Sequence, residues 1–331
     1  MGNQAKIIIG ISMGDPNGVG LDIILKIFED RRMFDFFTVV LFAPKKLVQF
    51  HRDHFGFTTS IQFGTDLKKL NKAKLNVVEV ELADYQVHFG AEDTKAGECA
   101  LASLKVATLA LQNNSIAALV TAPIHKKSIQ SEQFDFPGHT QFLAKELAGD
   151  ALMLMLTDQL RVALVTDHIP VKEVSETVTS ELLATKITQF YHSLQQDFGI
   201  TKPKIAVLGM NPHAGDAGVI GEEDDTIIQP VLTDFQGKGK LVYGPYSADS
   251  FFGSNAAAKF DGILAMYHDQ GLIPFKTLSF GEGVNFTAGL TAVRTSPDHG
   301  TAFDIAGKGF ATISSFKAAL FAAKEIAQRR V

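Results

Sequence analysis

Three histidines share one placement, because each stands a few residues after a short apolar run of strand length. They are His168, His213 and His268. In open α/β sheets, ligands bind outside the carboxyl ends of the strands, where such residues meet. Imidazole is the commonest metal ligand, and three histidines with an open fourth position form a known catalytic zinc arrangement. Taken singly, each histidine reads as an ordinary polar loop residue. The repeated placement favours a metal site, although no local motif such as HExxH is present.

Three carboxylates stand beside these histidines in the sequence. They are Asp167, Asp216 and Asp269. A carboxylate next to a metal-binding imidazole commonly accepts a hydrogen bond from its second ring nitrogen. We therefore expect these residues to orient the histidines or to act as further ligands.

A glycine-rich segment, GDPNGVG at 14–20, follows the first apolar run and precedes a helical pattern. It begins G-x-G, but Ile23 holds the third glycine position of the dinucleotide fingerprint, and no Gly-Lys-Ser/Thr follows as in a P-loop. The segment is either a tight turn with positive φ or an anion-binding loop at a helix N-terminus. The acidic Asp15 argues against direct phosphate contact.

Further polar residues suit anion binding. His139 or Thr140 stands at the predicted start of a helix, where free N–H groups can face an anion or where the side chain only caps the helix. Lys276, Asn285 and Arg294 lie in or near a glycine-rich stretch. Arginine suits bidentate binding of phosphate or carboxylate, and lysine acts as a point charge. Taken singly, these cations read as solvated surface residues.

The segment RTSPDHGTAFDIAGKG at 294–309 is too polar and too rich in glycine for a core. It precedes a long helical pattern at the end of the chain. We therefore expect a loop that wraps a ligand.

Short apolar runs rich in Ile, Val and Leu alternate with helical patterns along the chain. The clearest runs are 6–12, 37–42, 116–120, 161–165, 204–209 and 262–266, and the clearest helical patterns are 94–113, 180–197, 222–235 and 311–330. Near-continuous apolar runs are typical of strands that are buried on both faces of a parallel sheet. The alternation predicts an α/β fold. Cys99 lies in the first of these helices and is expected to be a small core residue.

Composition limits the class of protein. The chain has 331 residues, 46% of them hydrophobic and 20% charged, with a formal net charge of −5 and one cysteine. These values exclude a disordered or collagen-like chain and a disulfide scaffold, and the length favours about two domains. The charge gives no reason to expect nucleic-acid or membrane binding. No apolar stretch reaches the roughly 20 residues that span a bilayer, and the N-terminus does not read as a signal peptide, so a cytoplasmic protein is expected.

Eight segments together resemble one known family, that of the 4-hydroxythreonine-4-phosphate dehydrogenases of vitamin B6 biosynthesis. They are GDPNGVG at 14–20, TAPIHK at 121–126, PGHTQFLA at 137–144, TDHIP at 166–170, NPHAGDAGVIGEED at 211–224, YHDQGLIPFK at 267–276, GVNFTAGL at 283–290 and RTSPDHGTAFDIAGKG at 294–309. The resemblance runs nearly from end to end and in order.

The last segment also resembles the cofactor loop of the isocitrate and isopropylmalate dehydrogenases. The resemblance therefore implies two α/β/α domains of that type with an interdomain cleft, divided as 1–125 plus 290–331 and 126–289. In those enzymes the loop holds the adenosine part of a nicotinamide cofactor without a Rossmann fingerprint. Phe303 stands where they often have proline, so the detail of cofactor contact stays open.

The resemblance also assigns roles to individual residues. His168, His213 and His268 would bind a divalent metal (zinc, magnesium or cobalt), with His268 supplied by the second subunit of a homodimer. The substrate residues would be His139, Thr140, Lys276, Asn285 and Arg294. The residues near the NAD or NADP cofactor would be His299, Gly300, Thr301 and Asp304. The general base is not identified, and Lys276 and Asp269 are the candidates.

The implied reaction oxidises 4-phosphohydroxy-L-threonine to a 3-keto acid, which loses CO2 to give 3-amino-2-oxopropyl phosphate. Three alternatives stay open. The chain can be a paralogous dehydrogenase of another phosphorylated hydroxy acid such as 4-phosphoerythronate, a phosphate acyltransferase on a related fold, or a non-catalytic binding module. Fold similarity alone does not choose among them.

Overall fold

The computed structural model describes residues 6–64, 66–132, 134–136 and 138–330. These residues divide into two compact units. The first contains the described residues up to Gly149 together with Leu290–Arg329, and the second contains Asp150–Gly289 with Arg330. The domain boundaries expected from the sequence, 1–125 plus 290–331 and 126–289, stay a prediction.

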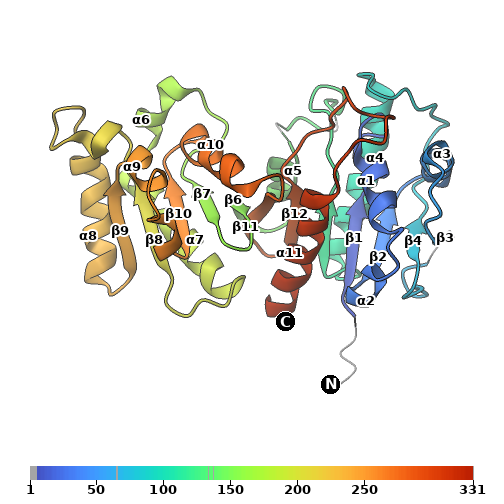
Figure 1. Ribbon diagram of the computed structural model, residues 1–331, viewed down its shortest axis with the longest axis horizontal. Coiled ribbons are helices and arrows are strands. Elements are labelled where there is room, and N and C mark those ends of the chain that lie inside the picture. Colours follow the sequence, from blue (N-terminus) through green and yellow to red (C-terminus); the bar gives the residue numbers. More distant parts are fainter. Residues whose placement is uncertain (1–5, 65, 133, 137, 331) are drawn as a thin grey trace. The chain divides into compact units, whose positions relative to one another are not determined.

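The first unit contains a sheet with strand order β3-β4-β2-β1-β5-β12, in which all neighbours pair in parallel. Its strands are β1 (Ile8–Ser12), β2 (Thr38–Phe42), β3 (Ile61–Phe63), β4 (Leu75–Val78), β5 (Ala118–Thr121) and β12 (Val293–Pro297). Its helices are α1 (Gly20–Ile27), α2 (Met33–Phe36), α3 (Lys45–Phe55), α4 (Thr94–Gln112), α5 (His139–Glu146) and α11 (Ser314–Arg330). Helix α4 packs against β1, β2 and β5 (Figure 1).

The second unit contains a sheet with strand order β11-β6-β7-β10-β8-β9. Its strands are β6 (Gly149–Leu156), β7 (Arg161–Leu164), β8 (Lys204–Leu208), β9 (Leu241–Tyr246), β10 (Gly262–Ala265) and β11 (Val284–Leu290). The α-helices are α6 (Val174–Thr177), α7 (Ser180–Gln196), α8 (Gln229–Gly237), α9 (Ala248–Phe252) and α10 (His268–Ser279). Shorter helical segments are η1 (Val171–Glu173), η2 (Pro212–Gly215), η3 (Asp224–Ile228) and η4 (Ala257–Lys259). Helix α10 packs against β7 and β10.

Burial explains why the apolar runs form strands. Every residue of β2, β5 and β10 is buried, as expected for strands covered on both faces. Cys99 on α4 is also buried, which confirms its interpretation as a core residue. Two helices begin at capping side chains, since Asp93 accepts from the Lys95 amide before α4 and Thr179 accepts from the Leu182 amide before α7. The α/β fold predicted from the sequence is confirmed.

The structure adds detail to the sequence predictions in several places and corrects the one for Arg294. The first four residues of the segment 294–309 belong to β12, whose five residues are all buried, so only the part from 298 onward is a loop. Arg294 is therefore a strand residue rather than a solvated surface cation. The helix expected at 222–235 is present, and its first part is a π-helical segment, η3, that continues directly into α8. The pairing of β6 with β7 is antiparallel, which the apolar runs do not reveal.

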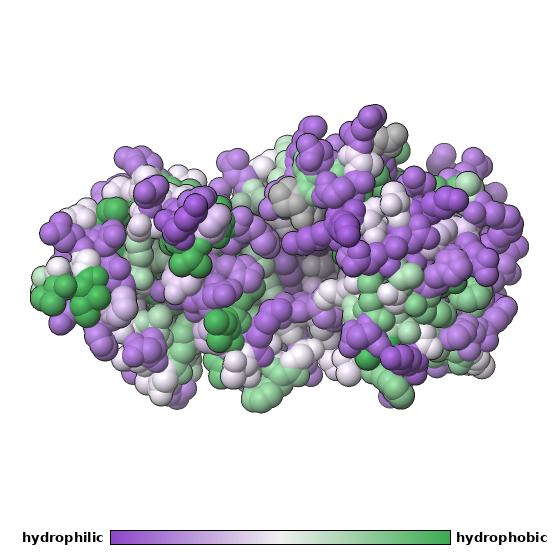
Figure 2. Space-filling model, turned by 90° about the horizontal axis from the view of Figure 1, so that it is seen from above, coloured by the Kyte–Doolittle hydropathy of each residue, from purple (hydrophilic) through white to green (hydrophobic). Residues whose placement is uncertain are grey.

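Polar residues cover most of the surface seen in Figure 2, and hydrophobic residues appear there as separate patches. Among the helices of the described residues, none combines the length and the apolar character that a membrane span requires.

The loop after β1 contains a tight turn, one of the two alternatives that the sequence leaves open. Gly14 has φ of +73°, and a Cβ atom at this position would collide with the Pro123 carbonyl oxygen. The next residue, Asp15, is only 1% exposed. Its Oδ1 accepts from the Asn17 amide at 2.9 Å, while its Oδ2 is buried and has no hydrogen-bond partner among the described residues. Burial raises the pKa of this carboxyl to about 6, and nearby Asp93 adds to the effect, whereas the Asn17 amide and His125 oppose it.

This raised pKa predicts a loss of stability as the pH increases. Between the ordinary pKa of 3.8 and the folded value of about 6, the unfolded chain releases the proton that the folded chain keeps. The stabilising contribution is therefore complete below pH 4 and is lost as the pH rises through 6. The shift corresponds to roughly 3 kcal/mol in the free energy of unfolding. We expect urea unfolding to show this at pH 4 and pH 7. The free energy of unfolding should fall less between these two pH values for an Asp15→Asn variant than for wild type.

The matched control is Asp35→Asn, which removes an exposed carboxyl on α2. An Asp15→Asn variant with the same change in unfolding free energy between the two pH values as wild type would contradict the assignment.

Candidate functional site

His168 and His268 lie side by side in the second unit. Their ring centroids are 5.6 Å apart, and the ring planes make an angle of 48°. The strands β7 and β10 that lead to them pair in parallel. Beyond these strands, the Thr166 amide and hydroxyl both donate to the Met266 carbonyl oxygen, at 3.1 and 2.7 Å. The structure thus brings this pair of strand-end histidines together, while their role as metal ligands stays a prediction.

A carboxylate neighbours each of these two imidazoles. The Nδ1 atom of His268 lies 2.7 Å from Asp269 Oδ1, and the Nδ1 atom of His168 lies 3.7 Å from Asp167 Oδ2. Interaction with the His168 side chain lowers the pKa of the Asp167 carboxyl to about 2, against the opposing effect of its partial burial. A proton on Nδ1 that donates to the carboxylate leaves the Nε2 lone pair for a metal. Imidazole and carboxylate are donor types that a divalent cation takes as ligands.

His213 stands on the short helical segment η2 that follows β8. Both His213 and Ala214 have left-handed backbone conformations, with φ of 55° and 52°. Such conformations cost free energy in residues other than glycine and need support from their surroundings. The support comes from Asp224, which is fully buried and accepts from the amides of Met210 and Asn211 at 2.8 and 3.0 Å.

Asp224 is a residue that the sequence analysis misses. It stands in a run of four carboxylates, 222–225, that reads as the start of a helix. The side chain of Asn211 also donates to Asp224, at 3.1 Å, and to Glu223, at 2.7 Å. Nothing in the run distinguishes the buried member, so its function in holding the His213 loop is visible only in the structure.

A cavity of about 550 Å³ lies next to His213 in the second unit. Its lining includes His213, Asp249, Tyr267 and Asp269, so His213 and the carboxylate that neighbours His268 face one space. Gln270 joins the ends of two strands at this cavity, because its side chain accepts from the Met266 amide at 2.7 Å and donates to the carbonyl oxygen after β8 at 2.6 Å.

No three His, Cys, Asp or Glu residues among those that the structure describes gather into a group that could hold a metal. One chain brings His168 and His268 together, and His213 does not complete a three-residue group with them. The resemblance implies that His268 comes from a second subunit, whereas in this chain it lies beside its own His168. The assignment of ligands to subunits stays a prediction.

Arg294 is the buried cation of the first unit. Only 2% of it is exposed, and burial lowers its pKa to about 9. Strand β12 pairs in parallel with β5, so Arg294 lies beside the end of β5. There its Nε and Nη2 atoms donate to Thr121 Oγ1 at 3.1 and 2.6 Å. The guanidinium is thereby held in one orientation at the carboxyl end of the sheet.

His139 and Thr140 occupy the first two positions of α5. The Nε2 atom of His139 is buried without a hydrogen-bond partner among the described residues. Burial lowers the pKa of His139 well below its usual range, and the charges of Arg294 and Lys126 lower it further. Both cations therefore act on the start of this helix, where free N–H groups and the helix dipole also favour an anion. Pro137, in the same sequence segment, lies outside the described residues.

The other two predicted substrate residues belong to the second unit. Lys276 is exposed in the last turn of α10, and Asn285 stands on β11. The Oδ1 atom of Asn285 is buried and has no hydrogen-bond partner in the described part of the chain. An amide oxygen in this state is suited to accept a hydrogen bond from a ligand.

The predicted cofactor residues lie on the loop between β12 and α11, which rests on the GDPNGVG segment. The Thr301 carbonyl oxygen accepts from the Val19 amide at 3.1 Å. A Cβ atom at Gly18 would lie 2.9 Å from the same oxygen, so only glycine permits this approach. The Nε2 atom of His299 is buried without a partner among the described residues. Gly300 and Asp304 are exposed.

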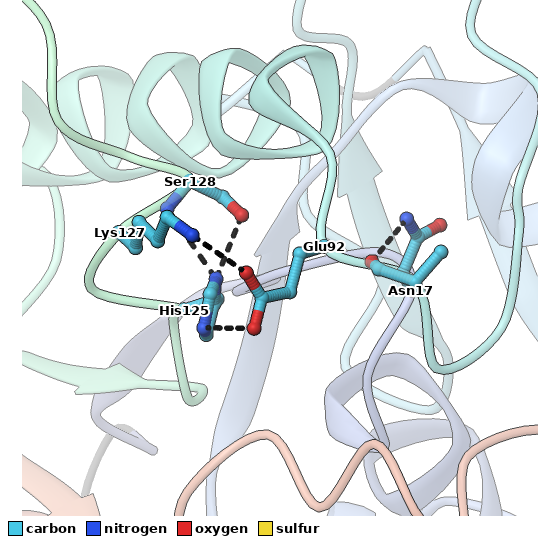
Figure 3. Close-up of polar contacts among 6 residues, drawn as sticks. Asn17, Glu92, His125, Lys127 and Ser128 are labelled. Atoms are coloured by element: carbon cyan, nitrogen blue, oxygen red, sulfur yellow. Dashed lines mark hydrogen bonds and ion pairs between the residues drawn. The ribbon is translucent and has the colours of Figure 1, made fainter.

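A network of side chains fixes the segment at 85–93 against this region. Asn17 donates to the Tyr85 hydroxyl at 2.8 Å and to the Ala91 carbonyl oxygen at 3.0 Å. Figure 3 shows His125 beside Ser128 and Glu92, where its Nδ1 lies 2.7 Å from Ser128 Oγ and its Nε2 lies 3.6 Å from Glu92 Oε1. The GDPNGVG segment therefore contacts both the segment at 85–93 and the loop expected to hold the cofactor.

Comparisons with known proteins identify the family of this chain. The sequence model described as "Pyridoxal phosphate biosynthetic protein PdxA" matches residues 35–323. A curated relative from Bacteroides thetaiotaomicron, named 4-hydroxythreonine-4-phosphate dehydrogenase, is 46% identical over 99% of this chain and 90% of its own length. A relative of the same name from Ruegeria sp. is 39% identical over 98% of both chains.

Solved structures give the same result. The crystal structure of 4-hydroxythreonine-4-phosphate dehydrogenase from Klebsiella pneumoniae matches with a TM-score of 0.86 and 33% identity, over 99% of this chain and 100% of that one. The EutD phosphotransacetylase from Staphylococcus aureus matches with a TM-score of 0.52 and 13% identity, over 95% and 94% of the two chains, and shares the fold alone. The chain therefore belongs to the PdxA family of pyridoxal phosphate biosynthetic proteins, an enzyme family whose curated members are named 4-hydroxythreonine-4-phosphate dehydrogenase.

Proposed function

We propose that the chain oxidises the secondary hydroxyl of 4-phosphohydroxy-L-threonine with NAD+ or NADP+ in vitamin B6 biosynthesis. The two electrons and one hydrogen pass to the nicotinamide, and the hydroxyl proton is released. The resulting 3-keto acid loses CO2 and gives 3-amino-2-oxopropyl phosphate. Family membership over nearly the whole chain supports this reaction. The observation in the structure that carries it is the pair of imidazoles, His168 and His268, each beside a carboxylate.

The metal ligands in this proposal are His168, His213 and His268, with one of the three supplied by the partner subunit of a homodimer. The resemblance assigns that ligand to His268. When bound, a divalent metal (zinc, magnesium or cobalt) would lower the pKa of the substrate hydroxyl and polarise the carbonyl that forms from it. Asp269 accepts from a proton on His268 Nδ1 and leaves the Nε2 atom of that ring available to the metal.

The chain's own residues perform the remaining steps. The residues that bind the phosphorylated substrate in this proposal are His139, Thr140, Lys276, Asn285 and Arg294. Fixing a substrate by its remote phosphate lowers the barrier through orientation of the reacting group. Lys276 and Asp269 are the candidates for the base that takes the hydroxyl proton.

The cofactor residues of this proposal are His299, Gly300, Thr301 and Asp304. The orphaned Nε2 atom of His299 and the support of the loop by Val19 fit a ligand at this place. Steady-state kinetics with NAD+ and with NADP+ distinguish the two cofactors. We propose the cytoplasm as the site of the reaction.

Replacement of one imidazole tests the metal site. A His213→Ala variant should lose most of the bound divalent metal and most of the turnover, because the ligand set then lacks one member. Metal content is measured after dialysis against limiting zinc, cobalt or magnesium. His192→Ala removes an exposed histidine on α7 and is the matched control. Wild-type metal content and turnover in the His213→Ala variant would refute the ligand assignment.

Replacement of the buried guanidinium tests phosphate recognition. An Arg294→Ala variant should raise the KM for the phosphorylated substrate by about tenfold to 100-fold, as expected for a lost charge-assisted hydrogen bond. Arg294→Lys, which keeps the charge without the bidentate geometry, provides a variant that is less prone to unfold. Arg329→Ala, on the exposed part of α11, is the control. If both Arg294 variants discriminate between phosphorylated and unphosphorylated 4-hydroxythreonine as wild type does, Arg294 does not bind the phosphate.

A further inference from the structure

The first unit contains a second cation close to the start of α5. Lys126 follows β5 by a few residues, in the TAPIHK segment. A Cβ atom built on Gly138 would lie 3.8 Å from Lys126 Cε, so the end of this lysine side chain reaches the residue that precedes α5. The same helix start lies within the electrostatic reach of Arg294, as the depressed pKa of His139 indicates. Two cations and a helix N-terminus therefore meet at His139.

The neighbouring lysine has a different environment. Figure 3 shows Lys127 directed at Glu92, with its Nζ atom 3.4 Å from Glu92 Oε2. Glu92 also lies 3.6 Å from His125 Nε2 and is thus shared by two basic groups. Lys126 forms no ion pair with any residue that the structure describes. Its charge is therefore available to a ligand, whereas that of Lys127 is already matched.

We propose that Lys126 binds a phosphate monoester together with Arg294 and the first turn of α5. This inference rests on the proposed function and extends it, because it adds a residue to the predicted substrate set. The segment that follows β5 then contributes twice: Thr121 orients Arg294 through its hydroxyl, and Lys126 supplies a mobile point charge.

The chemistry of these groups favours phosphate over a neutral ligand. A phosphate monoester near neutral pH carries between one and two negative charges and three acceptor oxygens. A buried guanidinium with fixed geometry, an ammonium on a flexible stem and free helix N–H groups can share these oxygens. The unpartnered Nε2 of His139 adds one further polar atom. The phosphate can belong to the substrate or to the cofactor, and the experiment separates the two.

The test measures the binding of inorganic phosphate to the whole chain by isothermal titration calorimetry. Lys126→Ala should weaken phosphate binding about tenfold, as expected for the loss of one charge-assisted contact. Lys126→Arg should retain most of the affinity, and Lys127→Ala should bind like wild type. Thermal unfolding confirms that each variant is folded.

Steady-state kinetics identify the source of the phosphate. A substrate phosphate predicts that Lys126→Ala raises the KM for the phosphorylated substrate and leaves kcat and the KM for NAD+ and NADP+ nearly unchanged. A raised KM for either cofactor instead would overturn the assignment to the substrate. Phosphate affinity of Lys126→Ala equal to wild type, or an equal loss in Lys127→Ala, would overturn the proposal. If phosphate binding depends on Lys126 but 4-phosphohydroxy-L-threonine is not oxidised by wild type, the proposed function fails and the assignment of Lys126 to an anion site stands.

Discussion

Parallel pairing brings the carboxyl ends of neighbouring strands to one edge of a sheet, and both units of this chain use that constraint. In the first unit, the pairing of β5 with β12 sets Thr121 beside Arg294. In the second unit, the pairing of β7 with β10 sets His168 beside His268. The residues in each pair are about a hundred or more positions apart in the sequence. A different register of either strand pair would separate them.

Each of these edges contains a buried charged group that is held by hydrogen bonds. Arg294 holds its charge inside the first unit, and Asp224 lies fully buried in the second. Burial of a charged group costs several kcal/mol unless hydrogen bonds offset it. Asp224 accepts from two backbone amides and one side chain, and these bonds hold the left-handed turn that carries His213. Both groups therefore fix geometry at a place where a ligand is expected.

Much of this arrangement is predictable from the sequence, because apolar runs mark buried strands and polar residues at their ends mark the ligand edge. The placement of His168 and His268 follows from that pattern. Arg294 is not predictable in the same way, since a strand with the sequence Val-Arg-Thr-Ser-Pro has no apolar periodicity. Its position depends on contacts with β5 and α11. The Thr121 hydroxyl accepts from Arg294, and the Thr295 hydroxyl donates to the Ala319 carbonyl oxygen on α11.

The supporting residues are the least predictable. Asp224 is one of four successive carboxylates, and only the three-dimensional course of the loop selects it. Lys126 and Lys127 are adjacent in the sequence and alike in composition, yet only Lys127 has Glu92 within reach. Local sequence patterns contain no information on such tertiary contacts, because the partners come from other segments. The family resemblance supplies the expected ligand roles, and the structure supplies the positions of these side chains.

The central claim is that this chain is a dehydrogenase of a phosphorylated hydroxy acid with 4-phosphohydroxy-L-threonine as its preferred substrate. The most direct measurement offers the metal-supplemented chain this compound and 4-phosphoerythronate, each with NAD+ or NADP+, and records the absorbance of the reduced nicotinamide together with CO2 release. The account predicts reduced cofactor and CO2 in equal amounts with 4-phosphohydroxy-L-threonine, at a kcat/KM well above that for 4-phosphoerythronate. Preference for 4-phosphoerythronate, or acyl transfer between coenzyme A and phosphate without cofactor reduction, would contradict it.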